Sequence, residues 1–294
     1  MKYVMLLLFC ITNFCLCTAQ SKEELIDAIV KHNVYESDQI GGAGSLSQQY
    51  TAFETLAGKL TIKEITQLSN HKNGVLRMYA TDYLIEHGEA DPVAMFVNEL
   101  NRKETIETLN GCSGGFEITS LLVYHSYWNK IRIEALTGIN YKPNDIVEQA
   151  MSKRLKTDVK MREMDSVVIS TNAKIHWLVY VRAFENKNFS NNLLPQIEKL
   201  GFRKNNPYAI GYLINTYPKL YKERACKYYT EKFPRLKFTD DDENSMSYFH
   251  EFLELLLKTG DKKIQQIAVK VVKKSDYAEL PWFRNTFAAY NIKI

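Results

Sequence analysis

The sequence lacks a strong excess of charge of either sign. Its 294 residues include 38 Lys and Arg and 34 Asp and Glu, which give a formal net charge of +4. Nucleic-acid-binding domains usually carry a larger basic excess on one face, so we expect no nucleic-acid partner. Lysines do gather near the C-terminus, but they stand opposite an apolar stripe and fit the solvated face of a helix. They are Lys262, Lys263, Lys270, Lys273 and Lys274.

Metal-binding patterns are also missing. The histidines form no H-x-x-x-H pair and no cluster with cysteine, which excludes the usual spacings of a zinc site. We therefore expect neither a metal ion nor another cofactor. The six histidines are His32, His71, His87, His125, His176 and His250.

Long hydrophobic runs are confined to the N-terminus. Lys2 precedes the apolar run 4–11, and the triplet Cys17-Thr18-Ala19 supplies the small residues that a signal peptidase reads. The run is shorter than the ~20 residues of a membrane-spanning helix, so residues 1–19 fit a removed secretory signal better than an anchor. A lipid anchor is disfavoured because Leu16, not a small residue, precedes Cys17. We expect cleavage near Ala19, no membrane span, and a secreted or periplasmic bacterial protein.

Residues 71–101 carry the clearest helical pattern. Apolar side chains recur from Leu76 to Leu84 at the spacing of an amphipathic helix. Asn73 suits the N-cap of this helix, and Gly88 suits the left-handed position at its end. The residues between the apolar positions are predicted to face away from the core; they are Arg77, Thr81, Asp82 and Glu86.

A second helix follows after a short connection. Asp91 is expected to cap it and Pro92 to occupy its first position. Because so few residues join the two helices, we expect them to lie antiparallel.

Similar helix starts recur along the chain. Ser45 with Gln48, and Thr61 with Glu64, fit capping boxes. No convincing alternating strand is found, although the apolar run 176–181 fits either a buried strand or a buried helix. Further helices are predicted to begin at Asn144, at Asn206-Pro207, at 240–243 and after Gly260-Asp261.

The segment Asn73-Gly74-Val75-Leu76-Arg77, followed by Tyr79-Ala80, Tyr83-Leu84, Gly88 and Asp91-Pro92, resembles HEAT-like repeats of the phycobilisome-lyase type. The resemblance covers about one unit, 71–101. It implies an all-α fold over residues 20–294, an α-solenoid in which antiparallel helix pairs stack into a HEAT-like superhelix. It also implies that Arg77 is a structural residue, and that the chain is a binding scaffold whose partner the repeats do not reveal.

The solenoid expectation bears on the two cysteines that remain after cleavage, since Cys10, Cys15 and Cys17 leave with the signal. Cys112 and Cys226 lie 114 residues apart, which is about three to four helical units. Contacts in a solenoid run mainly between neighbouring units, so we predict that these cysteines do not form a disulfide.

Gly111-Cys112-Ser113-Gly114-Gly115 fits G-x-S-x-G, the turn that presents a nucleophilic serine. That chemistry needs a strand before the turn and a helix after it. The preceding residues 101–110 are polar and read as helix or loop, so we interpret the segment as a flexible connector between helices. A hydrolase that uses Ser113 or Cys112 is the weaker hypothesis.

Two further patterns have structural explanations. Asp240, Asp242, Asn244 and Glu251 imitate part of a calcium loop, but Ser245 replaces the glycine of its sharp turn and the acidic residues also suit a helix start. An apolar stripe contains His125 and has aromatic residues nearby, which is more typical of a core than of a binding patch. These aromatic residues are Tyr124, Tyr127 and Trp128.

Together these observations favour a non-catalytic, monomeric, exported helical repeat protein that binds another protein or a cell-envelope component. An inhibitor or immunity-type protein against one exported enzyme is the alternative. No catalytic or metal-binding residue is assigned, and the binding residues are left open.

Overall fold

The computed structural model describes residues 20–137, 144–186, 189–239 and 244–293. The predicted signal peptide and two residues of the calcium-like pattern, Asp240 and Asp242, lie outside this part of the chain. The described residues are mostly helical, which confirms the helical part of the prediction, but they also form a four-stranded sheet. The all-α class was therefore too narrow. The chain divides into two compact units, Met1–Ala90 with Lys103–Leu122, and Asp91–Arg102 with Val123–Ile294.

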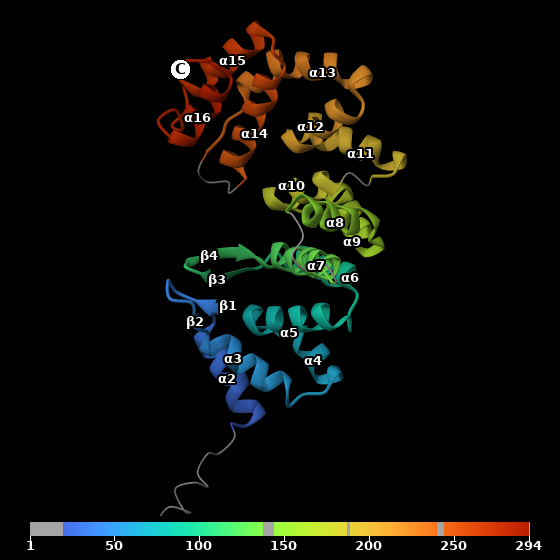
Figure 1. The fold of residues 1–294 in the computed structure, drawn as a ribbon, viewed down its shortest axis with the longest axis vertical. Helices are drawn as coiled ribbons and strands as arrows, with labels where there is room; N and C mark the ends of the chain where they lie inside the picture. The colour runs from blue at the N-terminus through green and yellow to red at the C-terminus, as the bar shows by residue number, and fades with distance from the viewer. Residues whose placement is uncertain (1–19, 138–143, 187–188, 240–243, 294) are drawn as a thin grey trace, which may run out of the picture. The chain divides into compact units, whose positions relative to one another are not determined.

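The first unit combines short helices with the sheet (Figure 1). Its helices are α2 (Lys22–His32), α3 (Gln48–Ala57), α4 (Ile62–Leu68) and α5 (Gly74–His87), and its strands are β1 (Tyr35–Ile40), β2 (Ser45–Leu46), β3 (Thr105–Gly111) and β4 (Ser113–Ile118). The helix α7 (Thr119–Ala135) begins in this unit and continues in the second.

The sheet has the strand order β2-β1-β3-β4, with β1 and β3 parallel and both outer pairs antiparallel. In β3 the buried Ile106 and Thr108 alternate with the exposed Thr105 and Glu107, the period of a strand with one covered face. This alternation spans too few residues to stand out in the sequence. The strand pairs on one side with β4, which follows it directly, and on the other with β1, some 70 residues earlier in the chain.

The caps predicted for α5 are confirmed. The Asn73 side chain accepts from the Leu76 backbone N–H, and Gly88 adopts the left-handed conformation at the C-terminus. One expectation about its faces was wrong: Arg77 and Thr81 are buried. The reason is that α5 contacts α2, α4, β1 and β3, so protein covers more than one of its faces.

The strand β1 is tied to α5 by a tyrosine. The Tyr79 hydroxyl donates to the Glu36 carbonyl at 2.9 Å and accepts from the Glu36 backbone N–H at 2.8 Å. The Tyr79 ring stacks on Phe53 of α3 with the ring centroids 5.2 Å apart. Helix and strand residues therefore share one core in this unit.

Two other predicted helix starts differ in their outcome. Thr61 and Glu64 form the capping box expected for α4. The box expected from Ser45 and Gln48 was wrong, because Ser45 lies in β2 and the N-cap of α3 is Ser47.

The second unit is built from helices and a few short helical turns. These are α6 (Pro92–Arg102), α7, α8 (Asn144–Thr157), α9 (Val159–Ser170), α10 (Trp177–Asn186), η1 (Asn191–Leu193), α11 (Leu194–Glu198), η2 (Lys199–Arg203), α12 (Pro207–Thr216), α13 (Pro218–Glu231), η3 (Phe233–Arg235), α14 (Ser245–Lys258), α15 (Lys262–Val272) and α16 (Pro281–Ala289). The ambiguous run 176–181 thus lies in a helix, α10, except for its first residue, His176.

Several helices in this unit begin at the predicted capping residues. Pro92 is the first residue of α6, and an Asp91 carboxylate oxygen accepts from the Val93 backbone N–H. Asn206 caps α12 and Asp261 caps α15. Because α5 and α6 belong to different units, their antiparallel pairing stays a prediction.

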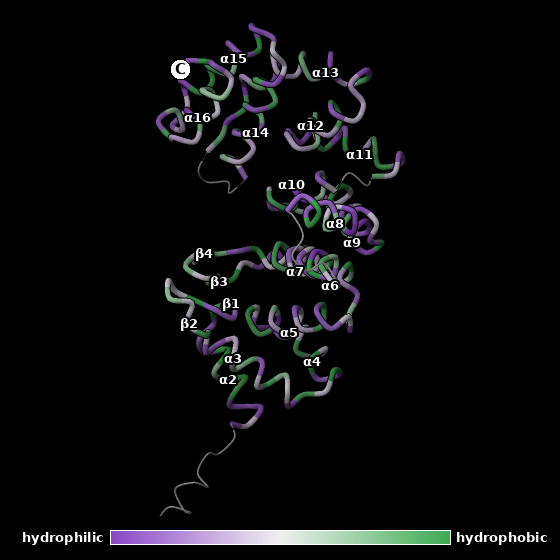
Figure 2. Tube along the Cα trace, in the orientation of Figure 1, coloured by the Kyte–Doolittle hydropathy of each residue, from purple (hydrophilic) through white to green (hydrophobic). Residues whose placement is uncertain are grey.

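Hydrophobic and hydrophilic residues alternate along the helices of both units (Figure 2). This is the pattern of helices that bury one face and expose the other. Within the described ranges no helix is both long and apolar enough to cross a membrane.

Candidate binding cavity

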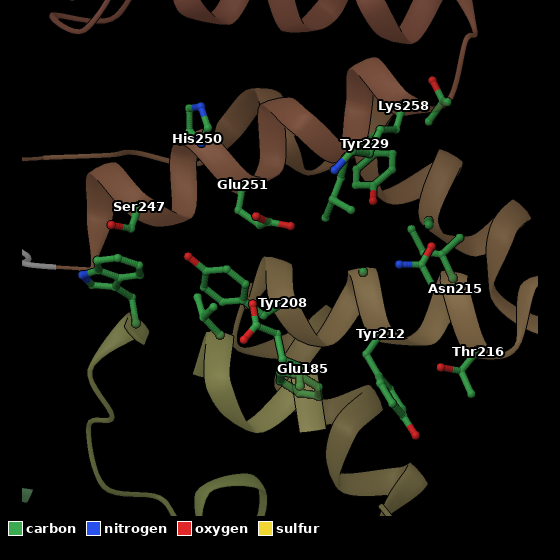
Figure 3. Close-up of a pocket in the computed structure, with 18 of the residues that line it drawn as sticks. Glu185, Tyr208, Tyr212, Asn215, Thr216, Tyr229, Ser247, His250, Glu251 and Lys258 are labelled. Atoms are coloured by element: carbon green, nitrogen blue, oxygen red, sulfur yellow. The ribbon is translucent and has the colours of Figure 1, made fainter. Parts of the chain in front are cut away.

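The second unit contains a cavity of about 520 Å³ that five of its helices line. Small-molecule sites in proteins commonly measure roughly 300–1,000 Å³, so this space can hold an organic group or a side chain of a partner. Residues of α10, α12, α13 and α14 form its walls, and Trp282 of α16 joins them. Figure 3 shows many of these side chains.

Aromatic rings make up much of the wall. Tyr212 packs against Phe184 with the ring centroids 5.5 Å apart, and Trp282 stacks on His250 at 4.1 Å. Such rings offer a large apolar surface with little rotamer freedom to lose on binding. The aromatic lining residues are Trp177, Phe184, Tyr208, Tyr212, Tyr229 and Trp282.

Tyr229 presents a hydroxyl without a partner. Its side chain is fully buried, and within the described part of the chain the hydroxyl makes no hydrogen bond. In Figure 3 this hydroxyl points from α13 into the cavity. A buried polar group without a hydrogen-bond partner costs about 1–3 kcal/mol of stability. A ligand that hydrogen-bonds to the Tyr229 oxygen would remove this cost, which favours binding. Burial also raises the pKa of Tyr229, which keeps the hydroxyl protonated.

A carboxyl group reaches the same space from α14. Glu251 is largely enclosed, and burial raises its pKa above the ordinary value. Among the residues described, its side chain has no hydrogen bond and no ion pair. Glu185 of α10 projects toward the cavity from the facing wall (Figure 3). Two carboxyl groups on different helices therefore border one aromatic space.

The basic residues of the lining lie at its exposed margin. The Lys258 ammonium pairs with Glu254 at 2.8 Å, and Lys222 is exposed on α13. His250 Nε2 hydrogen-bonds the Thr286 hydroxyl at 2.7 Å, and burial lowers the His250 pKa. This imidazole is therefore neutral at pH 7.

The G-x-S-x-G segment lies in the first unit and forms a hairpin. A strand, β3, precedes it, so the expected helix or loop before the segment was wrong, as was the flexible connector. A second strand, β4, follows it instead of the helix that a nucleophile elbow requires. Both Ser113 and Cys112 are exposed at this turn. The geometry that activates a serine in such an elbow is not present here.

A serine, a carboxylate and a histidine do meet in the first unit, at a second hollow of about 730 Å³. Ser47 donates to one oxygen of Glu36 at 2.6 Å, and His32 Nε2 lies 2.8 Å from the other. In a catalytic triad the histidine contacts the serine, whereas here both contact the carboxylate. Ser47 Oγ also accepts from the Tyr50 backbone N–H as the N-cap of α3, so the group is structural.

The remaining residues of the calcium-like pattern have separate roles. The Asn244 side chain accepts from the Trp177 backbone N–H at 2.7 Å and donates to the Ile175 carbonyl at 2.9 Å. Glu251 lines the cavity. In the ranges that the structure describes, no three acidic, histidine or cysteine side chains gather as a metal-binding group.

In the aromatic stretch 124–128 the expected core position is confirmed for Tyr124 and Tyr127, whereas Trp128 is half-buried. Tyr124 and Tyr127 are buried and donate to Asp165 and Asp158, at 2.6 and 2.9 Å. Two guanidinium groups lie over the Trp128 ring, that of Arg132 at 4.2 Å and that of Arg182 at 4.3 Å from the ring centroid. Both are favourable cation–π contacts, and the one from Arg182 joins α7 to α10.

Sequence reasoning missed the cavity because its residues are spread from Trp177 to Trp282. One local feature pointed to it. Along α14 the lining residues Ser247, Glu251, Leu255 and Lys258 recur at helical spacing and form a mixed polar and apolar face. Glu251 stands on this face beside the buried apolar stripe of α14. A charged residue at such a position lies partly inside the protein, and this could have pointed to a polar cavity.

Compared with models of known protein families, with curated proteins and with solved structures, the chain matches none.

Proposed function

We propose that this chain is an exported, non-catalytic binding protein, and that the cavity of its second unit receives part of a partner. The partner is another protein or a component of the cell envelope. One observation carries the proposal: a cavity of about 520 Å³ lined by rings, with a buried Tyr229 hydroxyl that has no hydrogen-bond partner in the described part of the chain. A space of this kind is suited to enclosing a group from outside the chain.

We also propose that the helices stack as a HEAT-like α-solenoid. In the second unit, helices that follow one another along the chain also contact one another, as α12 does α13 and α14 does α15. Short connections such as Gly260-Asp261 join them. Stacks of helix pairs commonly act as binding scaffolds, which supports a binding role rather than a chemical one.

To test the proposal, the cavity of the folded protein is blocked by a chemical label. Cys226 lines it, and Cys112 lies in the exposed hairpin of the first unit, so each can be labelled alone with a bulky maleimide in a variant that lacks the other. The variants are Cys112→Ser and Cys226→Ser. Both labelled proteins are then used to capture partners from an extract of the cell envelope.

We expect the protein labelled at Cys226 to lose a partner that the protein labelled at Cys112 retains. If both capture the same partner equally well, the cavity is not the binding site. Sequencing the N-terminus of the exported protein tests the other part of the proposal, with Gln20 expected as the first residue.

A further inference from the structure

We propose that the ligand group of this cavity is a primary ammonium on an aliphatic chain, held by the Glu251 carboxylate and the Tyr229 hydroxyl oxygen and enclosed by the aromatic walls. The inference rests on the binding function proposed above and specifies the chemistry of the ligand. A lysine side chain of a partner protein and a free alkylamine share this chemistry.

The hydrogen-bonding groups of the cavity define the first requirement. Glu251 offers carboxylate oxygens, the exposed Glu185 offers more at the margin of the facing wall, and the Tyr229 oxygen has no partner among the described residues. An ammonium group has three donors and no acceptor, so it complements these acceptors. A cation beside Glu251 would also compensate the burial of its charged form.

The walls define the second requirement. Trp177, Tyr208 and Trp282 present ring surfaces to the same cavity as the carboxyl groups. The electron-rich faces of such rings attract cations, and they also cover the methylene groups of an alkyl chain. The chain itself shows this chemistry elsewhere, since the Arg224 guanidinium lies 4.1 Å from the Phe202 ring centre.

The charges around the cavity favour a cationic ligand over an anionic one. Lys258 is exposed and pairs with Glu254, although its charge also acts on Glu251; Lys222 is exposed, and neutral His250 adds no positive charge at pH 7. An anion would have to lie beside the enclosed Glu251 carboxyl without a buried cation to hold it. A cation meets that carboxyl directly.

The test uses n-hexylamine, with n-hexanol as a neutral probe of similar size. Two of the three tryptophans of the chain, Trp177 and Trp282, line the cavity, so tryptophan fluorescence reports occupancy. We expect saturable binding of hexylamine at pH 7, at least about tenfold tighter than binding of hexanol. Glu251→Gln should weaken hexylamine binding by about tenfold or more, and Tyr229→Phe should weaken it several-fold.

The matched control is Glu223→Gln, an exposed glutamate of α13 outside the cavity, which should bind hexylamine like the wild type. Circular dichroism verifies that each variant is folded. A second readout needs no variant: hexylamine should slow alkylation of Cys226 in the wild-type protein and leave that of exposed Cys112 unchanged.

Equal binding of hexylamine and hexanol, or unchanged binding to Glu251→Gln, would overturn the proposal. So would tighter binding of a neutral sugar such as methyl glucoside, which would make the cavity a carbohydrate site. If these outcomes appear while labelling at Cys226 still blocks partner capture, the cavity is the binding site and only the ligand class is wrong.

Two further probes separate the sources of the ammonium group. A short peptide with one lysine, compared with its Nε-acetylated form, represents a partner protein, and spermidine represents a free amine. Tighter binding of the lysine peptide assigns the site to a protein partner, and tighter binding of spermidine assigns it to a free amine. Either result supports the ammonium chemistry, whereas binding of neither would contradict it.

Discussion

The Tyr124 hydroxyl donates a 2.6 Å hydrogen bond to a carboxylate oxygen of Asp165, and both side chains are buried. This bond joins α7 to α9 inside the second unit. Burial and the neighbouring carboxylate raise the pKa of Tyr124, which keeps the donor proton in place. A short bond to a buried charge is stronger than one between neutral groups.

Replacing Tyr124 with Phe should therefore destabilise the second unit. Asp165 loses a donor inside the core, and we expect the free energy of unfolding to fall by about 1–3 kcal/mol in a urea titration. Tyr217→Phe is the control, since its hydroxyl donates a longer, exposed hydrogen bond of 3.3 Å to Asn191 and otherwise contacts the Tyr212 side chain, so its removal should change stability less than Tyr124→Phe does. Equal effects of the two variants would contradict the importance of the buried bond.

Arg77 is expected to be structural, and its surroundings give the reason. Its fully buried guanidinium donates to the His71 carbonyl at 2.8 Å and pairs with Glu104, the residue just before β3. Arg77→Ala removes these bonds and leaves a cavity, so we expect a loss of about 3 kcal/mol or more in unfolding free energy. The exposed pair of Arg284 and Glu279 is the comparison, and Arg284→Ala should cost less than about 1 kcal/mol. Unchanged stability of Arg77→Ala combined with loss of partner binding would show that Arg77 belongs to a binding site.

Gly74 is required by close packing against the strand region. A Cβ atom at this position would lie 2.6 Å from the Ile106 Cγ2 atom and 2.6 Å from a carboxylate oxygen of Glu104. Gly74→Ala should therefore force a shift and destabilise the first unit by about 1–3 kcal/mol. At Gly115 of β4 an added Cβ meets nothing within 4 Å, so Gly115→Ala should be tolerated. Thermal unfolding of both variants makes the comparison.

His125 should make stability depend on pH. Burial, followed by the charges of Arg182 and Arg132, lowers its pKa from 6.5 to about 4. Between about pH 4 and 6.5, His125 is therefore neutral in the folded state and protonated in the unfolded state. The contribution of neutral His125 to the unfolding free energy is complete above pH 6.5, declines as the pH falls toward 4, and is lost below that value.

We expect the unfolding free energy of the wild type to decrease between pH 7 and pH 5. His125→Gln should show a smaller decrease over the same interval, because it removes the titrating group. Urea titrations at the two pH values measure the difference. Parallel pH profiles for the two proteins would contradict this role of His125.

Cys112 and Cys226 are both free thiols in the structure, one exposed and one half-buried. We predict that they stay unpaired in protein recovered from an oxidising compartment. Peptide mapping without reducing agent should yield each cysteine in a separate peptide. A peptide pair joined through these two residues would also count against the proposed α-solenoid.

Helix boundaries could be predicted from the sequence because capping is local. Asn73, Thr61, Asn206 and Asp261 each accept hydrogen bonds from backbone N–H groups two or three residues further on. Such bonds need no distant partner. Ser45 shows the limit of this reasoning, because pairing with β1 draws it into a strand and leaves Ser47 as the cap.

Only the tertiary structure decided the sheet and the cavity. β1 and β3 are short strands whose parallel pairing depends on residues far apart in the chain, so no local pattern specifies it. Arg77 sits in a helix with a predictable stripe, yet its burial depends on Glu104 and its neighbours. Glu251 resembles a calcium ligand in sequence. Its enclosure among rings from other helices depends on how those helices pack, which short-range propensities do not contain.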